Sequence, residues 1–130
     1  MIYSVNHDSK DGMILAEVHG EIDFKLLKDC AKTVMGIAQQ IHCPFVLTDM
    51  RKAQINTSAI EISIFLKELS GIVSGHGFTI HPLKRAFVTK PADQKFDFYE
   101  NVCHNYGHNA KRFYDVLAAR NWLLTRNSAE

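Results

Sequence analysis

The chain has 130 residues, 46% of them hydrophobic, which is enough for one domain with a buried core and too few for two, so we expect a single domain over residues 1–130. Fifteen lysines and arginines against 14 aspartates and glutamates give a net charge of +1, which provides no electrostatic argument for nucleic acid or an anionic membrane as a partner. No apolar run approaches the roughly 20 residues of a membrane span, and the start lacks the charged region of a signal peptide, so we expect a cytoplasmic protein.

The three cysteines are widely and irregularly spaced, at Cys30, Cys43 and Cys103. An odd number without a CxxC pair argues against a disulfide framework. We therefore expect reduced thiols that pack as small apolar side chains.

The first part of the chain predicts a hairpin followed by a helix. Residues 2–7 and 13–19 alternate between apolar and polar positions, and residues 8–12 between them end in an Asp-Gly turn. Asp23 is a suitable cap for a helix with apolar residues at steps of three and four. This helix should end near His42, because Pro44 disfavours helical geometry in the residue before it.

Residues 45–50 read as a central strand, because a continuous apolar run is typical of a strand covered on both faces. Residues 51–54 are expected to form a polar turn. The next helix is indicated by Ser58 and Glu61, whose spacing is that of a capping box. The alternation of Ile60, Ile62 and Ile64 also fits a strand, but the length of the segment and the capping box favour a helix through residue 69.

The last part of the chain continues the alternation of strands and helices. Glycines 71, 75 and 77 predict a loop that contains His76 and His81, followed by a short strand at residues 85–89. Asp93 is the expected cap of a helix that ends at Gly107. A strand at residues 111–114 and a helix capped by Asp115 complete the chain. We predict an α/β fold with a mixed sheet, whose later strands are parallel and joined by right-handed crossovers.

The junction between the central strand and the following helix is the candidate site. Open α/β sheets usually bind ligands where the carboxyl end of a strand meets the N-terminus of a helix. The candidate residues for interaction or phosphorylation are Asp49, Arg51, Asn56, Thr57 and Ser58. Asp49 with its basic neighbours either binds an anionic ligand or peptide or only orders the turn.

Two further groups of residues suggest less specific roles. His104 and His108 have a spacing that can hold zinc, but no glutamate stands between them and Gly107 interrupts the helix, so we expect no metal or other cofactor. The third helix carries more aromatic residues than one apolar stripe can bury. The excess either lines a pocket for an apolar ligand or forms a homodimer patch, and we favour the homodimer. These aromatic residues are Phe96, Phe98, Tyr99 and Tyr106.

Three short segments resemble STAS domains, in the right order along nearly the whole chain. Residues 18–23 (Val-His-Gly-Glu-Ile-Asp) resemble the strand-to-helix entry of that family. Residues 47–50 followed by 56–60 (Asn-Thr-Ser-Ala-Ile) lie where anti-sigma-factor antagonists carry an Asp-Ser-Ser-Gly-Leu phosphorylation motif. Residues 111–115 (Lys-Arg-Phe-Tyr-Asp), with Ala119, Trp122 and Leu123 behind them, resemble the C-terminal signature of the SpoIIAA-like branch, whose fold is related to CRAL-TRIO lipid-transfer domains.

The resemblance implies a four- or five-stranded sheet with about four helices mostly on one face, no enzymatic activity, and a role in binding or regulation. In the antagonists the second serine of the motif is phosphorylated, and Ser58 occupies that place here, although Asn56 replaces the Asp and Ala59 the Gly. The leading hypothesis is a non-catalytic module that acts through contact with a regulatory protein partner, as a homodimer. The alternatives are a carrier or sensor of a small apolar or anionic molecule, and an antagonist controlled by phosphorylation of Ser58.

Overall fold

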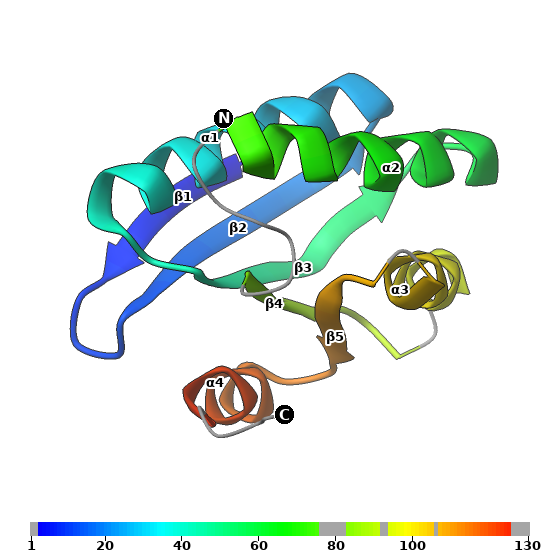
Figure 1. The fold of residues 1–130 in the computed structure, drawn as a ribbon. Helices are drawn as coiled ribbons and strands as arrows, with labels where there is room; N and C mark the ends of the chain where they lie inside the picture. The colour runs from blue at the N-terminus through cyan, green and yellow to red at the C-terminus, as the bar shows by residue number, and fades with distance from the viewer. Residues whose placement is uncertain (1–2, 76–82, 92–93, 106, 126–130) are drawn as a thin grey trace.

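In the residues that the structure describes, the fold is one five-stranded sheet with four helices (Figure 1). It is taken from a computed structural model that describes residues 3–75, 83–91, 94–105 and 107–125. In chain order the elements are β1 (Tyr3–Asp8), β2 (Met13–Ile22), α1 (Phe24–Ile41), β3 (Phe45–Ile55), α2 (Ala59–Gly75), β4 (Lys84–Val88), α3 (Gln94–Asn105), β5 (Asn109–Phe113) and α4 (Val116–Leu124). None of the helices in these ranges is long and apolar enough to cross a membrane.

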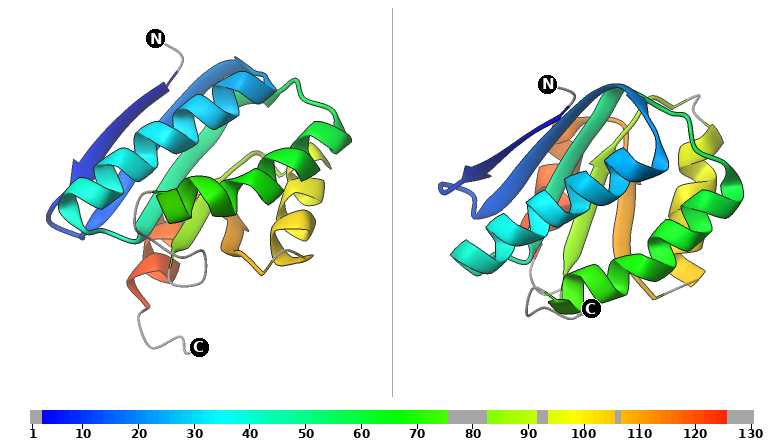
Figure 2. Two further views of the ribbon diagram at one scale, coloured as in Figure 1. Left: turned by 45° about the horizontal axis from the view of Figure 1, so that its top comes forward. Right: turned by 90° about the horizontal axis from the view of Figure 1, so that it is seen from above.

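The strands lie side by side in the order in which they occur in the chain. β1 is antiparallel to β2, and every later neighbouring pair is parallel. Because right-handed crossovers that advance in one direction across a sheet place their helices on one face, α1, α2 and α3 share a face. α4 follows the last strand, forms no crossover and lies on the opposite face (Figures 1 and 2). The predicted mixed sheet, with helices mostly on one face, is confirmed.

Each face of the sheet has its own apolar layer. The larger layer joins the inner faces of α1, α2 and α3 to the sheet and includes Ile14, Val34, Leu66 and Phe87. The smaller layer lies under α4 and is formed by Met13, Leu47, Ala86, Val88, Ala119 and Leu123. β3 and β4 contribute to both layers, as expected for strands in the middle of a parallel sheet.

The predicted helix caps are confirmed for three helices. The Asp23 carboxylate accepts a hydrogen bond from the Leu26 amide at 2.9 Å, and Asp115 accepts one from Ala118 at 2.8 Å. α1 ends at Ile41, and His42 adopts the left-handed conformation (φ 55°) that is common after a helix. The cap of α2 is described with the candidate site.

The central strand is longer than predicted, since β3 runs through Ile55 and residues 51–54 are part of it rather than a turn. The register of β3 with β2 shifts between Glu17 and His19, whose partners Asp49 and Lys52 are three residues apart instead of two. Such a bulge breaks the alternation of a strand. Arg51 and Lys52 are therefore both exposed, and the buried positions resume at Ala53.

The helix predicted from residue 58 is confirmed, with α2 at Ala59–Gly75. Ile62 is 1% exposed and Ile60 is 74% exposed, so the isoleucine alternation reflects two sides of a helix. The prediction of a loop from Gly71 is wrong for residues 71–75, because Gly71 and Gly75 are both helical. His76, Gly77, His81, Asp93 and Tyr106 lie outside the described residues.

Candidate functional site

The candidate residues predicted from sequence fall into two separate groups in the structure. Asp49 and Arg51 lie within β3, whereas Asn56, Thr57 and Ser58 follow its end. Ile55 lies six steps along the strand after Asp49, which at roughly 3.3 Å per residue is about 20 Å. The prediction that Asp49 lies beside the start of the next helix is therefore wrong, because the strand does not end at residue 50.

Asp49 and Arg51 form an ion pair on the strand surface. Arg51 donates from Nε to Asp49 Oδ1 at 3.0 Å and from Nη2 to Oδ2 at 2.8 Å, and its amide also reaches Oδ1. The side-chain hydrogen bond from Arg51 is the main reason that the pKa of the Asp49 carboxyl lies below its ordinary value, while partial burial acts in the opposite direction. The bidentate contact occupies much of the Arg51 fork, which makes it a poor receptor for a second anion.

Asn56 and Thr57 connect the end of β3 to the end of β2. The Asn56 amide and the Thr57 hydroxyl both donate to the Ile22 carbonyl, at 2.9 and 3.1 Å. The Thr57 side chain is 3% exposed. Thr57 therefore positions the segment before α2, and its hydroxyl is not accessible to a partner.

Ser58 and Glu61 form the predicted capping box. The Ser58 hydroxyl accepts from the Glu61 amide at 3.1 Å, while the Ser58 amide and hydroxyl donate to Glu61 Oε1 at 3.1 and 3.2 Å. Ser58 is exposed, and so are two large apolar side chains just beyond it, Ile60 at 74% and Ile64 at 43%. The start of α2 therefore offers an apolar surface beside a hydroxyl, which we call the α2 surface (Ser58, Ile60 and Ile64).

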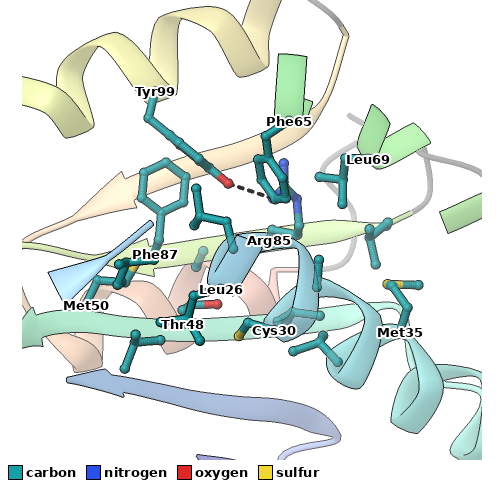
Figure 3. A pocket seen from close by; sticks show the side chains of 18 residues that line it. Leu26, Cys30, Met35, Thr48, Met50, Phe65, Leu69, Arg85, Phe87 and Tyr99 are labelled. Atoms are coloured by element: carbon teal, nitrogen blue, oxygen red, sulfur yellow. Dashed lines mark hydrogen bonds between the residues drawn. The ribbon is translucent and has the colours of Figure 1, made fainter. Parts of the chain in front are cut away.

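A second feature is a partly open cavity of about 90 Å³ between the sheet and helices α1, α2 and α3 (Figure 3). Most of its lining is aliphatic, aromatic or sulfur-containing. Its walls include Leu26, Cys30 and Met35 from α1, Phe65 and Leu69 from α2, Met50 from β3 and Phe87 from β4.

Arg85 of β4 brings a positive charge to this apolar cavity. The guanidinium donates to the Tyr99 hydroxyl at 3.3 Å and to Cys103 Sγ at 3.6 Å, and Nη2 lies 3.0 Å from His108 Nδ1. Burial raises the pKa of Tyr99 to about 12 and also raises the pKa of Cys103, so both stay neutral at ordinary pH. Among the described residues, no carboxylate forms an ion pair with Arg85.

The sequence reasoning missed Arg85 and predicted Tyr99 only in part. Tyr99 belongs to the aromatic excess of α3, for which a pocket was one of two alternatives. Its ring packs edge-on against Phe87, with centroids 5.1 Å apart. Arg85 and Phe87 are two positions apart on β4 and therefore share a face of the sheet. The sequence feature that could have pointed to Arg85 is a single arginine at an inward-facing position of a buried strand.

The two histidines near the end of α3 have structural contacts. His104 Nε2 lies 3.0 Å from the Ala110 carbonyl, and His108 contacts Arg85. Within the described ranges, no three His, Cys, Asp or Glu side chains gather closely enough to hold a metal ion. The three cysteines are free thiols, with Cys43 and Cys103 buried and Cys30 partly buried.

No family model and no curated protein matches the sequence, but solved structures match the fold. The anti-sigma factor antagonist SpoIIAA in its unphosphorylated form has a TM-score of 0.53 at 6% identity, over 89% of this chain and 91% of that one. An anti-sigma factor antagonist from Mycobacterium paratuberculosis has a TM-score of 0.54 at 14% identity, over 94% and 93%. An uncharacterized DUF3478 protein from Shewanella loihica PV-4, described as having a SpoIIAA-like fold, has a TM-score of 0.57 at 17% identity, over 93% and 91%.

The chain has a SpoIIAA-like fold. The similarity covers about nine-tenths of each chain in all three cases, so the resemblance predicted from sequence is confirmed at the level of the fold. In this SpoIIAA-like domain the α2 surface and the Arg85 cavity are separate features. The first lies on the outer side of α2 and the second between the inner sides of the helices and the sheet.

Proposed function

We propose that this SpoIIAA-like domain is a non-catalytic regulatory module that acts by binding a protein through its α2 surface. The observation that carries the proposal is the exposure of Ile60 and Ile64 on the same helix as the exposed Ser58. Residues four apart lie on one side of a helix, so the two isoleucines form one apolar strip. Two neighbours in fold are described as anti-sigma factor antagonists, which supports a regulatory role without specifying the partner.

Apolar residues on the outer side of a helix can be covered by another protein. Ile60 and Ile64 do not contribute to the core, because the inner side of α2 is formed by Ile62, Phe65, Leu66, Leu69 and Val73. Asn56 and Thr57 set the direction in which α2 starts, and Asp49 with Arg51 belongs to a different surface. Location in the cytoplasm stays a prediction.

A second copy of the chain is the first partner to test, since the homodimer stays a prediction. Light scattering after size-exclusion chromatography should give the mass of a dimer for the wild type and of a monomer for Ile60→Glu. Lys32→Glu, which changes the charge of an exposed position of α1, is the control and should remain dimeric. A wild type that is monomeric at micromolar concentration would exclude self-association through this surface.

Binding to a different regulatory protein requires a position-specific measurement. A photo-crosslinking amino acid at position 60, introduced in cells that naturally express the protein, should form adducts with a defined partner. The same probe at Glu21, an exposed position at the end of β2, should not form them, and Ile64→Glu should reduce them. Identical adducts at positions 60 and 21 would contradict a specific contact at the α2 surface.

Phosphorylation of Ser58 is a second candidate function, favoured by the contact between Ser58 Oγ and Glu61 Oε1 at 3.2 Å. A phosphate at this position would be tolerated by the helix N-terminus but repelled by the Glu61 carboxylate. The expected result is loss of the capping box and a changed α2 surface. Ser58→Asp should weaken binding of the partner while Ser58→Asn, an uncharged cap, should not. Equal affinities for the two variants would argue against the switch.

A further inference from the structure

We propose that the cavity beside Arg85 is a binding site for a small carboxylate with a short apolar body, held by its carboxylate at Arg85. This inference does not depend on the α2 surface or on its partner. It rests on three observations: the chemistry of the cavity walls, the contacts of Arg85, and the protonation state of Tyr99.

The cavity favours an apolar ligand body. Its walls are formed by side chains of α1, α2, α3, β2, β3 and β4 that are largely aliphatic or aromatic. The apolar walls offer no hydrogen-bond partners to water, and an apolar space of this kind binds apolar molecules of matching size. A volume of about 90 Å³ suits a chain of a few carbons.

Arg85 supplies one positive charge at the α3 side of this cavity (Figure 3). A guanidinium has five N–H donors. The contacts with Tyr99, Cys103 and His108 use one hydrogen of Nη1 and both hydrogens of Nη2. Among the contacts of the described residues, one N–H of Nη1 and the N–H of Nε are not used. These two N–H groups lie on different sides of the guanidinium and do not form a bidentate pair, so a carboxylate here accepts one charge-assisted hydrogen bond from one of them.

Tyr99 provides a further donor at the same place. Its oxygen accepts the hydrogen bond from Arg85 at 3.3 Å (Figure 3). Because burial raises the pKa of Tyr99 to about 12, the phenol keeps its proton at neutral pH. That proton can be donated to a carboxylate bound at Arg85, so the cation and the phenol can hold the same anion.

The missing counter-charge distinguishes Arg85 from the other inward arginine. Arg112 is paired with the Asp97 carboxylate, and its Nε donates to the Thr89 hydroxyl at 2.6 Å. In the part of the chain that the structure describes, the hydrogen-bond partners of Arg85 are a phenol, a thiol and an imidazole. An inward cation without a carboxylate is costly to stability. A ligand that brings the carboxylate removes this cost, whereas inorganic phosphate would lose its hydration against apolar walls.

The experiment is calorimetric titration of the full chain with butanoate, hexanoate and octanoate at neutral pH. At least one of them should bind with a Kd of about 1 mM or tighter, which corresponds to about −4 kcal/mol. Hexan-1-ol, which has the same chain as hexanoate and no charge, should bind at least tenfold more weakly. Inorganic phosphate and chloride should not compete at equal concentration.

Two variants assign the site. Arg85→Gln should weaken binding of the carboxylate at least tenfold, and Tyr99→Phe, which removes only the hydroxyl, should weaken it severalfold. Arg51→Gln is the matched control, because Arg51 is paired with Asp49 on the strand surface, and it should bind as the wild type does. Circular dichroism and thermal unfolding establish that each variant is folded.

The proposal is overturned if no carboxylate binds the wild type, if the alcohol binds as tightly as the acid, or if phosphate or chloride displaces the acid. Unchanged affinity in a folded Arg85→Gln variant would also overturn it. If Arg85→Gln does not fold, two measurements still test the proposal. These are the affinity of hexanoate compared with hexan-1-ol, and the affinity of hexanoate for Tyr99→Phe. Ile60→Glu should retain carboxylate binding, which separates this test from that of the α2 surface.

Discussion

Lys84 and Arg85 are neighbours on β4, yet their cationic side chains enter opposite layers of the protein. Lys84 is 4% exposed and donates from Nζ to the carbonyls of Trp122 and Thr125, at 2.6 and 2.9 Å. These carbonyls lie at the C-terminus of α4, where a positive charge is favourable. Arg85 faces the other helices, and its hydrogen-bond partners among the described residues are a phenol, a thiol and an imidazole rather than a carboxylate. Lys84 therefore has an evident structural role. Burial of the Arg85 charge has a cost in stability that the fold itself does not explain.

Substitution of these two residues by methionine should therefore have unequal effects on stability. Lys84→Met removes two hydrogen bonds from a charged donor to carbonyls at the end of α4, so it should lower the free energy of unfolding by about 2–4 kcal/mol. Arg85→Met removes an inward charge without a carboxylate partner and should stay within about 1 kcal/mol of the wild type. Urea unfolding followed by circular dichroism measures both. A loss at Arg85 as large as at Lys84 would contradict this assignment and make Arg85 a structural residue.

The capping box at the start of α2 predicts graded effects of substitution at Ser58. Ser58→Ala loses the acceptor for the Glu61 amide and should cost about 1 kcal/mol. Ser58→Asn retains a capping acceptor and should lower the free energy of unfolding by only about 0.3 kcal/mol. The free energy of unfolding from urea titration is the measurement, with Ser70→Ala on the exposed side of the same helix as control. If Ser58→Ala and Ser58→Asn lower the free energy of unfolding equally, the cap contributes little to stability.

The helix starts were the most predictable part of this fold, because a cap is a local interaction. Asp23, Ser58 and Asp115 each bond to an amide three residues later, so the signal and the structure lie within one turn. The parallel arrangement of the later strands followed from the alternation of strands and helices. The family resemblance implied the same sheet from short motifs.

The end of β3 was not predictable in this way, because it depends on a partner strand. Arg51 and Lys52 are consecutive polar residues and resemble a turn in isolation. They belong to a strand only because β2 extends beside them, with His19 opposite Lys52 after the bulge. This misplaced end also brought Asp49 next to Ser58 in the prediction, although the structure separates them by most of a strand.

The cavity was unpredictable for a different reason. Its walls come from six elements, and an empty volume results from how well side chains fill the space between them. Nothing in the sequence near Arg85 indicates that Tyr99 and Cys103, on a later helix, lie against it. Sequence alone placed Tyr99 on an aromatic helix and left its role open between a pocket and a dimer patch.

The ion pair between Asp49 and Arg51 predicts a specific pH dependence. Because Arg51 lowers the pKa of Asp49 below 3.8, this carboxylate contributes stability above pH 3.8, and the contribution is lost as the pH falls through the lower, folded pKa. Carboxyl ¹³C NMR titration should give a pKa below 3.8 for Asp49 in the wild type and a higher value in Arg51→Gln. Lys52→Gln should shift it less, because Lys52 acts on Asp49 only through space. If the pKa of Asp49 is the same in Arg51→Gln as in the wild type, the ion pair is absent in solution.

Cys30 provides a chemical probe of the cavity. Burial raises the pKa of its thiol from 9.0 to about 11, so at pH 8 the folded protein should hold about a hundredfold less thiolate at this position than an ordinary cysteine. Alkylation by iodoacetamide, followed by peptide mass spectrometry, should be slow at Cys30 in the folded protein and fast in urea. The rate in the folded protein should keep rising with pH towards 11, since only the thiolate reacts.

Because Cys30 also lines the cavity, saturating hexanoate should slow this reaction further in the wild type and not in Arg85→Gln. Hexan-1-ol at the same concentration is the matched control and should protect less. Alkylation of Cys30 in the folded protein at the rate seen in urea would show that the thiol is open to solvent, which contradicts the packing of α1 over the sheet. If alkylation is slow and hexanoate does not change its rate, Cys30 is buried as described. In that case any bound carboxylate does not contact α1.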